Sequence, residues 1–566
     1  MKRQKLKSLI WLIAFAAIFA TSCSKKTMPP LANSLFTTNP SPLELVGTKV
    51  PVTINGRFPA KWFEKETTIV VTPVLKYSGG EALSTSYTYQ GEKVAGNGMI
   101  ISYENGSPIT LRAEFDYIPA MKKSELFLRF DFSRKGKVVQ GFSDVKIADG
   151  VIATQALANA ATTTPAVAPD AFQRIIKETY DADIMFLIQQ AELRSSELNS
   201  SNLAAWKDLV KEADENERKN LNVEVSAYAS PDGGFDLNEK LAEKREKNTT
   251  DYLSKEFKKD RVDTEINAKY TAQDWEGFQK LVQASSLQDK DIVLRVLSMY
   301  PDTETREREI KNISAVYSDL AETILPKLRR SRLIANIEVV GKTDQELQQL
   351  ANSDLTGLTV EELLYMANLD GVSKEKIYTY ITQKYPNDYR GWNNLGAYYY
   401  TYGQTARAAQ AFNKAASVSS LAPEASMNQA LLSMSEGNLA KAEQLLGNAS
   451  GANTLGEAMG LLYIQKGEYN KAVQSFGEAK TNNAAVAQIL TKNYNKAQMI
   501  LNSLPDKDAT TYYLLAIVAA RTNNASGVAG NLKSSVELGT PTSEILNDIE
   551  FTRFLTNSDI RNMLLK

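Results

Sequence analysis

The chain contains no histidine and a single cysteine, Cys23, among its 566 residues. Without histidine, a serine–histidine triad, a histidine general base and a histidine-ligated metal are all excluded. One cysteine cannot form an intramolecular disulfide or a multi-cysteine metal site. Because no paired carboxylates or nucleophile motif stand out either, we expect a protein that is not an enzyme, with no catalytic residue, no metal and no cofactor.

The chain also lacks an excess of either charge. It has 65 Lys and Arg against 66 Asp and Glu, a formal net charge of −1, which gives no reason to expect a nucleic-acid partner. Hydrophobic residues make up 43% of the chain, as in globular proteins. A chain of this length exceeds what one hydrophobic core supports, so about three or four domains are expected.

The N-terminus explains the lone cysteine. Basic residues at positions 2–7 precede an apolar run, Leu9–Ala20, which has the length of a signal peptide and is too short to span a bilayer. The run ends in Ala-Thr-Ser-Cys, with Cys23 last. These residues resemble the lipobox of bacterial lipoproteins in the relaxed form common among Bacteroidetes. The resemblance implies that residues 1–22 are removed and that Cys23 is lipidated; the alternative is an ordinary secretory signal with an incidental cysteine.

The residues after Cys23 bear on which side of the membrane the body faces. Surface-exported lipoproteins of Bacteroidetes tend to carry acidic residues there, whereas this chain has no acid before Glu44. The resemblance therefore favours an outer-membrane lipid anchor with the body on the periplasmic face, and surface exposure stays open as the alternative. No later apolar run in the sequence is long enough for a membrane helix.

A polar, proline-bearing stretch at 23–41 is interpreted as a tether, and residues 42–150 as an antiparallel β-sandwich. In "ELFLRFDFS", every second residue from Leu126 to Phe132 is apolar, and the other face carries Phe127, Arg129 and Asp131, which is the period of a half-buried strand. The aromatic loop "GRFPAKWFEK" either folds over one end of this sandwich or forms a corner that docks a partner.

Residues 151–175 are small and proline-bearing without periodicity, which predicts an interdomain linker. Residues 176–342 follow as strand, helix, strand, helix, strand and a late strand, with a helical insertion at about 275–328. This order predicts a compact α/β sandwich.

Part of the central domain resembles a known family. The turn "PDGG" leads into a helix in which Asn238, Leu241 and Arg245 share one face, in the pattern Asn-x-x-Leu-x-x-x-Arg. This pattern and the closing strand "RRSRLIANIEV" resemble the OmpA-like domain, which binds peptidoglycan. The resemblance implies an α/β sandwich whose arginine grips the carboxylate of the peptide stem.

By that resemblance, the candidate peptidoglycan-binding residues are Arg245, Asn238, Asp232 and Ser230. Ser230 stands where the family has an aspartate for the stem ammonium, so Asp232 is the candidate replacement. The alternative is that Arg245 pairs with a local acid such as Asp236 and supports the fold. The basic run "PKLRRSRL" is either a solvated face or a contact for glycan or lipid phosphate.

Beyond position 342 the strand pattern disappears. Residues 343–388 read as helices that lead into repeats at 389–540, with capping helices at 541–566. Small and aromatic residues recur at the signature positions of the tetratricopeptide repeat, so paired helices are expected to stack into a solenoid. The signature residues are Trp392, Leu395, Gly396, Tyr399, Ala408 and Phe412 in one copy, and Gly460, Tyr463, Ala472 and Phe476 in another. Tyr398, Tyr399, Tyr400 and Tyr402 are either core residues or part of a groove for a partner.

Together these patterns predict a multidomain chain: an antiparallel β-sandwich, a central α/β OmpA-like sandwich and a C-terminal all-α tetratricopeptide solenoid. The predicted function is a non-enzymatic, periplasm-facing outer-membrane lipoprotein scaffold in envelope assembly or secretion. It would bind a protein partner through the repeats, with peptidoglycan as a candidate ligand of the central domain. The alternative is a surface-exposed adhesion, antigen or fimbria-associated lipoprotein whose OmpA-like domain does not bind peptidoglycan.

Overall fold

The computed structural model describes residues 28–139, 141–312 and 314–564. The predicted signal peptide and Cys23 lie outside these ranges. The chain divides into two compact units: the N-terminal residues up to Pro169 join Lys374–Lys566 in the first, and Asp170–Ser373 form the second. The second unit is thus an insertion in the sequence of the first. Within the described ranges, no helix combines the length and apolar character needed to cross a membrane.

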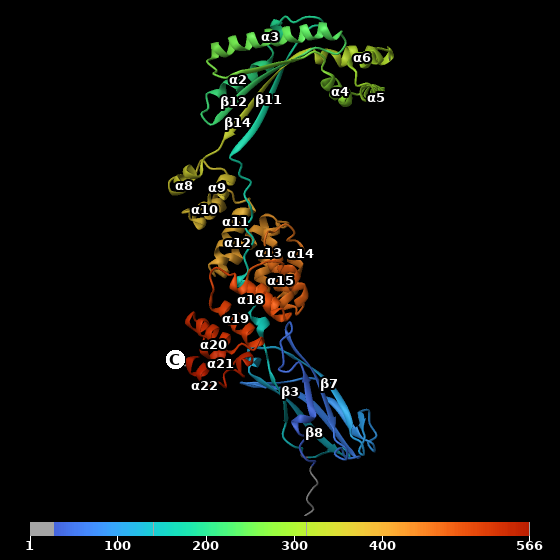
Figure 1. The fold of residues 1–566 in the computed structure, drawn as a ribbon, viewed down its shortest axis with the longest axis vertical. Helices are drawn as coiled ribbons and strands as arrows, with labels where there is room; N and C mark the ends of the chain where they lie inside the picture. The colour runs from blue at the N-terminus through green and yellow to red at the C-terminus, as the bar shows by residue number, and fades with distance from the viewer. Residues whose placement is uncertain (1–27, 140, 313, 565–566) are drawn as a thin grey trace, which may run out of the picture. The chain divides into compact units, whose positions relative to one another are not determined.

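The first unit begins with two β-sheets that pack face to face (Figure 1). The smaller sheet contains β1 (Phe36–Asn39), β2 (Lys49–Phe58) and β7 (Ser107–Asp116). The larger sheet contains β3 (Thr67–Tyr77), β4 (Gly80–Leu83), β5 (Tyr87–Gly91), β6 (Met99–Ile101), β8 (Ser124–Arg134), β9 (Lys137–Val139) and β10 (Val145–Gly150). All pairs are antiparallel except β5 with β6, so the predicted N-terminal β-sandwich is confirmed as a β-rich region of two sheets.

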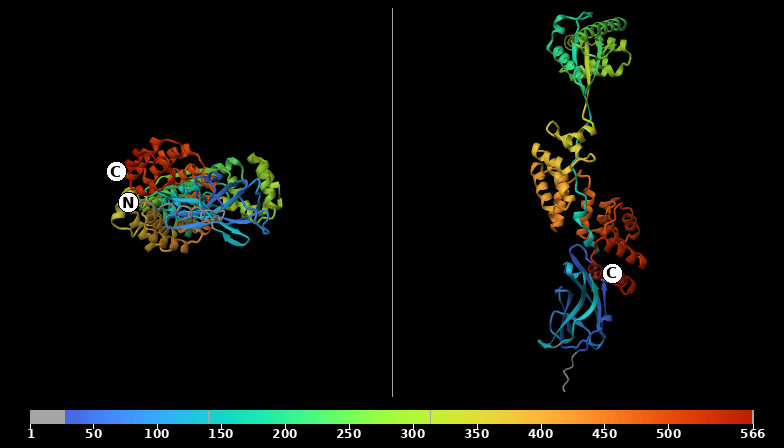
Figure 2. Two further views of the ribbon diagram at one scale, coloured as in Figure 1. Left: turned by 90° about the horizontal axis from the view of Figure 1, so that it is seen from below. Right: turned by 90° about the vertical axis from the view of Figure 1, so that its left-hand side faces the viewer.

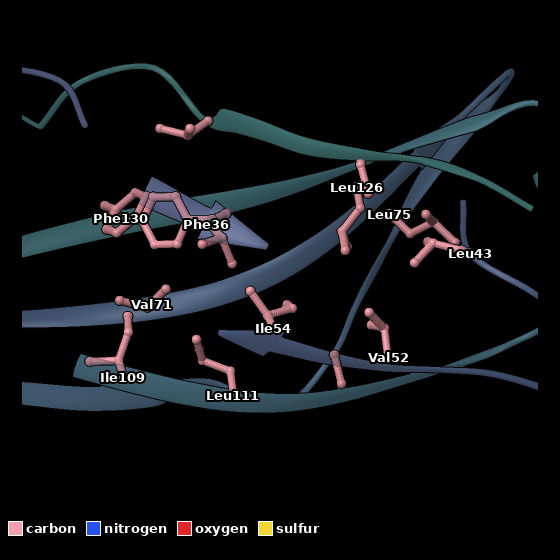
Figure 3. Packing of buried hydrophobic residues seen from close by; sticks show 14 of the residues in the cluster. Phe36, Leu43, Val52, Ile54, Val71, Leu75, Ile109, Leu111, Leu126 and Phe130 are labelled. Carbon is pink, nitrogen blue, oxygen red and sulfur yellow. The ribbon is translucent and has the colours of Figure 1, made fainter. Parts of the chain in front are cut away.

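The sandwich core follows from alternation along the strands. In β8, Leu126, Leu128 and Phe130 are buried while Glu125 and Asp131 are exposed. Figure 3 shows Leu126 and Phe130 among the buried side chains that fill the space between the sheets. Each fully buried side chain of this size contributes about 1.5–3 kcal/mol, so this alternation is the main stabilising feature of the sandwich.

The predicted tether is shorter than expected, because β1 already lies within residues 23–41. Phe36 is 5% exposed, and β1 pairs with β2 along its whole length. The aromatic loop also packs inward: Phe58 and Phe63 are fully buried, and Trp62 stacks on Phe58 with ring centroids 5.4 Å apart. The rings of this loop therefore complete the sandwich core.

The second unit is a two-layer α/β domain with the sheet order β11-β14-β12-β13. Its strands are β11 (Ile175–Met185), β12 (Lys219–Tyr228), β13 (Ile266–Thr271) and β14 (Arg330–Val340). Helices α2 (Ser201–Asp214) and α3 (Phe235–Asp260) pack on one face of the sheet, after the short α1 (Ser195–Leu198). The helical insertion forms a core of its own, from α4 (Trp275–Ala284), α5 (Lys290–Met299), α6 (Thr303–Asn312) and α7 (Ser314–Thr323).

The first strand of this unit begins at Ile175, the last residue of the predicted linker. Residues 175–181 show no strand pattern in the sequence, yet they pair in register with β14. Ile175 and Ile176 are 51% and 47% exposed. An edge strand that is exposed on both faces needs no alternation of apolar and polar residues, so the sequence does not predict a strand here.

Residues beyond the sheet are helical throughout. The second unit ends with α8 (Asp344–Asn352) and α9 (Val360–Met366). The first unit resumes with α10 (Lys374–Lys384) and continues as five helix pairs. These are α11 (Tyr389–Thr401) with α12 (Thr405–Val418), α13 (Pro423–Ser435) with α14 (Leu439–Gly447), α15 (Leu455–Gln465) with α16 (Tyr469–Phe476), α17 (Asn482–Leu490) with α18 (Tyr494–Asn502), and α19 (Ala509–Arg521) with α20 (Ala525–Glu537). Two short helices follow, α21 (Thr542–Leu546) and α22 (Ser558–Leu564).

The helix pairs are held by the small residues that identified the repeat. A Cβ placed on Gly396 would lie 2.6 Å from the ring of Phe412, and one on Gly460 would lie 2.5 Å from the ring of Phe476. Because real Cβ atoms do not approach a ring this closely, only glycine permits the contact. The predicted C-terminal array of helical repeats is therefore confirmed.

Candidate functional site

The segment predicted as a linker is not a free connector. Residues 154–168 run alongside the helices of the array (Figures 1 and 2), and Ala160, Ala166 and Ala168 are at most 2% exposed. We name residues 159–168 the groove segment, and the surface formed by the first helices α11, α13, α15 and α17 the groove. Its hydrogen bonds go to helix side chains rather than to a neighbouring strand, so it shows no periodicity of its own. The predicted linker at 151–175 is therefore wrong for most of its length.

Two asparagines grip the main chain of the groove segment in the same way. The Asn394 side chain accepts from the Ala168 N–H at 2.8 Å and donates to the Ala168 carbonyl at 2.9 Å. Asn428 does the same at Ala166, with both distances at 2.8 Å. A carboxamide pairs in this way with the N–H and C=O of one residue, as a neighbouring strand would. Each asparagine thus recognises backbone and not side chain.

Further polar side chains extend this ladder in both directions. Asn483 accepts from the Asn159 N–H at 3.0 Å and donates to its carbonyl at 2.9 Å. Tyr400 donates its hydroxyl to the carbonyl of Ala160 at 2.5 Å. Burial raises the pKa of the Glu457 carboxylate, and the nearby main chain of Thr164 offsets part of that rise.

The ladder residues come from corresponding helices. Asn394, Asn428 and Asn483 lie on α11, α13 and α17, each the first helix of its pair. Asn393, also on α11, reinforces the ladder by donating to the Ala166 carbonyl at 3.0 Å and by accepting from Asn428 at 3.0 Å. Asparagine is a poor helix former, so its recurrence inside these helices was the sequence signal that could have revealed the groove.

The segment is fixed on its N-terminal side to the sandwich and to the last helices. The Gln155 carboxamide accepts from the Gly47 N–H and donates to the Gly47 carbonyl, both at 2.8 Å. Tyr469 on α16 donates to the same carboxamide at 2.6 Å. Thr154 donates at 2.9 Å to Glu550, which forms an ion pair with Arg521. These bonds join sandwich and helical array within the first unit.

In the second unit, three of the four predicted ligand residues meet at the turn after β12. Asn238 donates to the carbonyls of Ser230 at 2.9 Å and Gly233 at 2.8 Å, so it holds the turn together. The Ser230 hydroxyl donates to the carboxylate of Asp232. Ser230 and Asn238 are 5% and 4% exposed, which leaves little of either for a ligand.

The fourth residue, Arg245, is fully buried and donates to three main-chain carbonyls. Its partners are the oxygens of Tyr228 at 2.8 Å, Gln190 at 2.9 Å and Leu187 at 3.1 Å. Burial, reinforced by the positive charge of Arg329, lowers the pKa of Arg245 to about 10. Neither open reading foresaw these partners, because the predicted ones were a ligand carboxylate and a local acid.

Sequence reasoning missed the cations that face the turn. Arg329 donates to Asp232 at 3.2 Å, and Lys311 donates to the Asp232 carbonyl at 3.0 Å. The neighbouring Arg330 bonds the buried Asp274 at 3.0 Å. Arg329 and Arg330 belong to the basic run "PKLRRSRL", so this part of the run neutralises acids of its own domain.

The signature residues of the array lie at or beside helix–helix contacts. Leu395, Ala408, Phe412, Ala472 and Phe476 are buried. Three others are aromatic side chains under cations, with the charged groups of Arg407, Lys414 and Lys471 over the rings of Tyr399, Trp392 and Tyr463. Of the tyrosine cluster, Tyr400 reaches the groove segment, whereas Tyr402 is 66% exposed.

Comparisons with known proteins give little beyond this geometry. No family model matches the chain, and no curated protein matches it. A tetratricopeptide repeat protein from Parabacteroides merdae is 12% identical, with a TM-score of 0.26 over 51% of this chain and 100% of its own. The Cut9–Hcn1 hetero-tetramer of APC/C is 16% identical, with a TM-score of 0.28 over 64% of this chain and 85% of its own. Yeast Tom70 is 11% identical, with a TM-score of 0.25 over 58% of this chain and 78% of its own. TM-scores this low carry no argument, so the helical repeats stand on the helix pairs themselves.

Proposed function

We propose that this chain is a non-enzymatic scaffold of a bacterial envelope, anchored in the outer membrane through a lipidated Cys23 and facing the periplasm. The helical array is the part that binds a protein partner, in envelope assembly or secretion. The observation that supports this role most directly is the groove itself. Asparagines on three first helices, α11, α13 and α17, hydrogen-bond the main chain of an extended segment, so the array is built to hold polypeptide.

The anchor is tested by fractionating cells that express the full chain or its Cys23→Ser variant. We expect the wild type in the outer-membrane fraction and the variant in the soluble periplasm, because acyl chains contribute about 0.8 kcal/mol per buried methylene. Protease treatment of intact cells distinguishes the two faces. Digestion of the body in unbroken cells would favour the alternative, a surface-exposed adhesion, antigen or fimbria-associated lipoprotein.

Partner binding is tested with a photo-crosslinking residue at Met499, an exposed position of the array, and at Val138, an exposed control position of the sandwich. Their side chains are 72% and 91% exposed. The proposal expects a discrete adduct from Met499 in living cells and none from Val138. Equal, diffuse labelling from both positions would contradict a partner site on the array.

For the second unit, we propose an OmpA-like fold that does not hold a peptide stem through Arg245. The sheet order, the helix face of Asn238 and Arg245, and the turn at Gly233 support the fold. The three carbonyl partners and complete burial of Arg245 support the second half of the proposal.

This second proposal is tested by sedimenting the detergent-solubilised full chain with insoluble peptidoglycan. The expected result is no retention above that of an unrelated control protein. Retention above the control in the wild type would contradict this expectation, and its loss in the Asp232→Asn variant would assign wall binding to the turn.

A further inference from the structure

The groove reads its occupant in two ways. The asparagine pairs recognise main chain, and the helix surface restricts side chains at alternate positions. Ala166 and Ala168 are 0% and 2% exposed and face the helices, whereas Val167 between them is 38% exposed. This alternation is that of an extended strand lying on a surface. A larger residue at either alanine position would have to displace the helix, while the residue between them is free to vary.

The groove segment is attached in a way that permits exchange. It forms only one short 3-10 turn of its own, Ala160–Thr162, and pairs with no strand. Its main-chain attachments at Ala166 and Ala168 are to side chains of α11 and α13. Another segment of the same chemistry would make the same bonds, since the bonded groups are present in every non-proline residue.

We propose that the groove between α11 and α17 is an exchangeable peptide-binding site whose ligand is an extended segment of a partner protein with alanine at two alternate positions. The chain's own groove segment is the tethered ligand that fills the site until it is displaced. This proposal rests on the proposed partner-binding function and specifies its ligand class. A tethered ligand acts at an effective concentration of about millimolar, so free peptide at micromolar concentration does not displace it from the wild type.

The test uses the full chain and a fluorescent peptide of wild-type sequence 157–170. The Ala166→Glu/Ala168→Glu variant changes only the tethered ligand and leaves the groove residues intact. We expect the variant to bind the peptide at least tenfold more tightly than the wild type, as measured by fluorescence anisotropy. Addition of Asn394→Ala and Asn428→Ala to that variant should abolish the gain.

Two controls keep the result interpretable. The single Ala168→Glu variant serves where the double variant does not fold, as judged by circular dichroism, and the same gain is expected of it. A peptide carrying glutamate at both alanine positions should not compete. Equal, weak binding of the wild-type peptide by wild type and a folded variant would overturn the proposal. That outcome leaves partner binding by another face intact, whereas absence of the Met499 adduct with peptide binding preserved would refute only a partner site beside Met499.

Discussion

Replacing Asn428 with alanine tests whether the asparagine ladder fixes the groove segment. Asn428 is fully buried, and its carboxamide makes both bonds to the main chain of Ala166. In the Asn428→Ala variant, the buried Ala166 N–H loses this acceptor. The Ala166 carbonyl keeps the bond from Asn393 at 3.0 Å. The Asn393 side-chain oxygen also loses the bond that it accepts from Asn428 at 3.0 Å, so the damage falls on one buried donor and one buried acceptor.

The magnitude follows from that count. An orphaned buried donor costs about 1–3 kcal/mol, and each lost hydrogen bond contributes about 1 kcal/mol net. The two costs overlap for the Ala166 N–H and are not simply added. We expect the free energy of opening the segment to fall by about 3 kcal/mol relative to the wild type. A change of that size corresponds to roughly a hundredfold in the opening equilibrium.

The assay is amide hydrogen exchange at residues 159–168, combined with urea unfolding of the full chain. Exchange at Ala166 and Ala168 should accelerate by about a hundredfold. The matched control is Asn413→Ala, which removes an exposed carboxamide whose partner is Gln429. It should change stability by less than about 0.5 kcal/mol. Equal exchange at Ala166 in both variants would refute the reasoning that side-chain clamps hold the segment.

Three other changes probe the repeats, the buried arginine and acid stability. Gly460→Ala places a Cβ against the ring of Phe476 and should lower the free energy of unfolding in urea by about 1–3 kcal/mol. The control Gly530→Ala, also within a helix but in open space, should raise it by about 0.5–1 kcal/mol. A change of the same sign in both variants would contradict the packing argument. Arg245→Lys removes the fork that bonds three carbonyls and should destabilise the second unit by about 3 kcal/mol in thermal unfolding; an unchanged midpoint would show that the carbonyls do not need the guanidinium. Glu346 has its pKa lowered to about 2 by a hydrogen bond from Arg218. The stabilisation from its ionised carboxylate is complete above the ordinary pKa of 4.5 and is lost as pH falls toward 2. The free energy of unfolding of Glu346→Gln should therefore fall less steeply with acid than that of the wild type. Equal slopes for the two proteins would contradict a stabilising role of the Glu346–Arg218 pair.

The elements best predicted from sequence are those with one buried face. The apolar alternation in 124–132 and the apolar stripe of the helix at 237–257 are periodic because each element buries one face and exposes the other. The strand at Ile175 lacks this periodicity, because it is an edge exposed on both faces. The groove segment lacks it for the opposite reason, since its bonding partners lie on helices more than 200 residues away.

The candidate ligand residues were predicted in part. The resemblance pointed to Ser230, Asp232 and Asn238, and these residues do lie together, because a turn and the first turns of a helix are fixed by nearby sequence. The surroundings of Arg245 were beyond such reasoning. Two of its carbonyl partners, Leu187 and Gln190, belong to the loop after β11, more than 50 residues earlier.

The order of synthesis gives the groove an unusual history. Asn159 emerges from the ribosome 324 residues ahead of Asn483, the side chain that receives it. At about 5–20 residues per second, that interval lasts tens of seconds. During this time the nascent chain carries the groove segment without the helices that bind it, while the intervening unit has time to fold. The helices of the array then have to fold around a segment that was synthesised long before them. The first unit can therefore complete its folding only after its last helices have been translated.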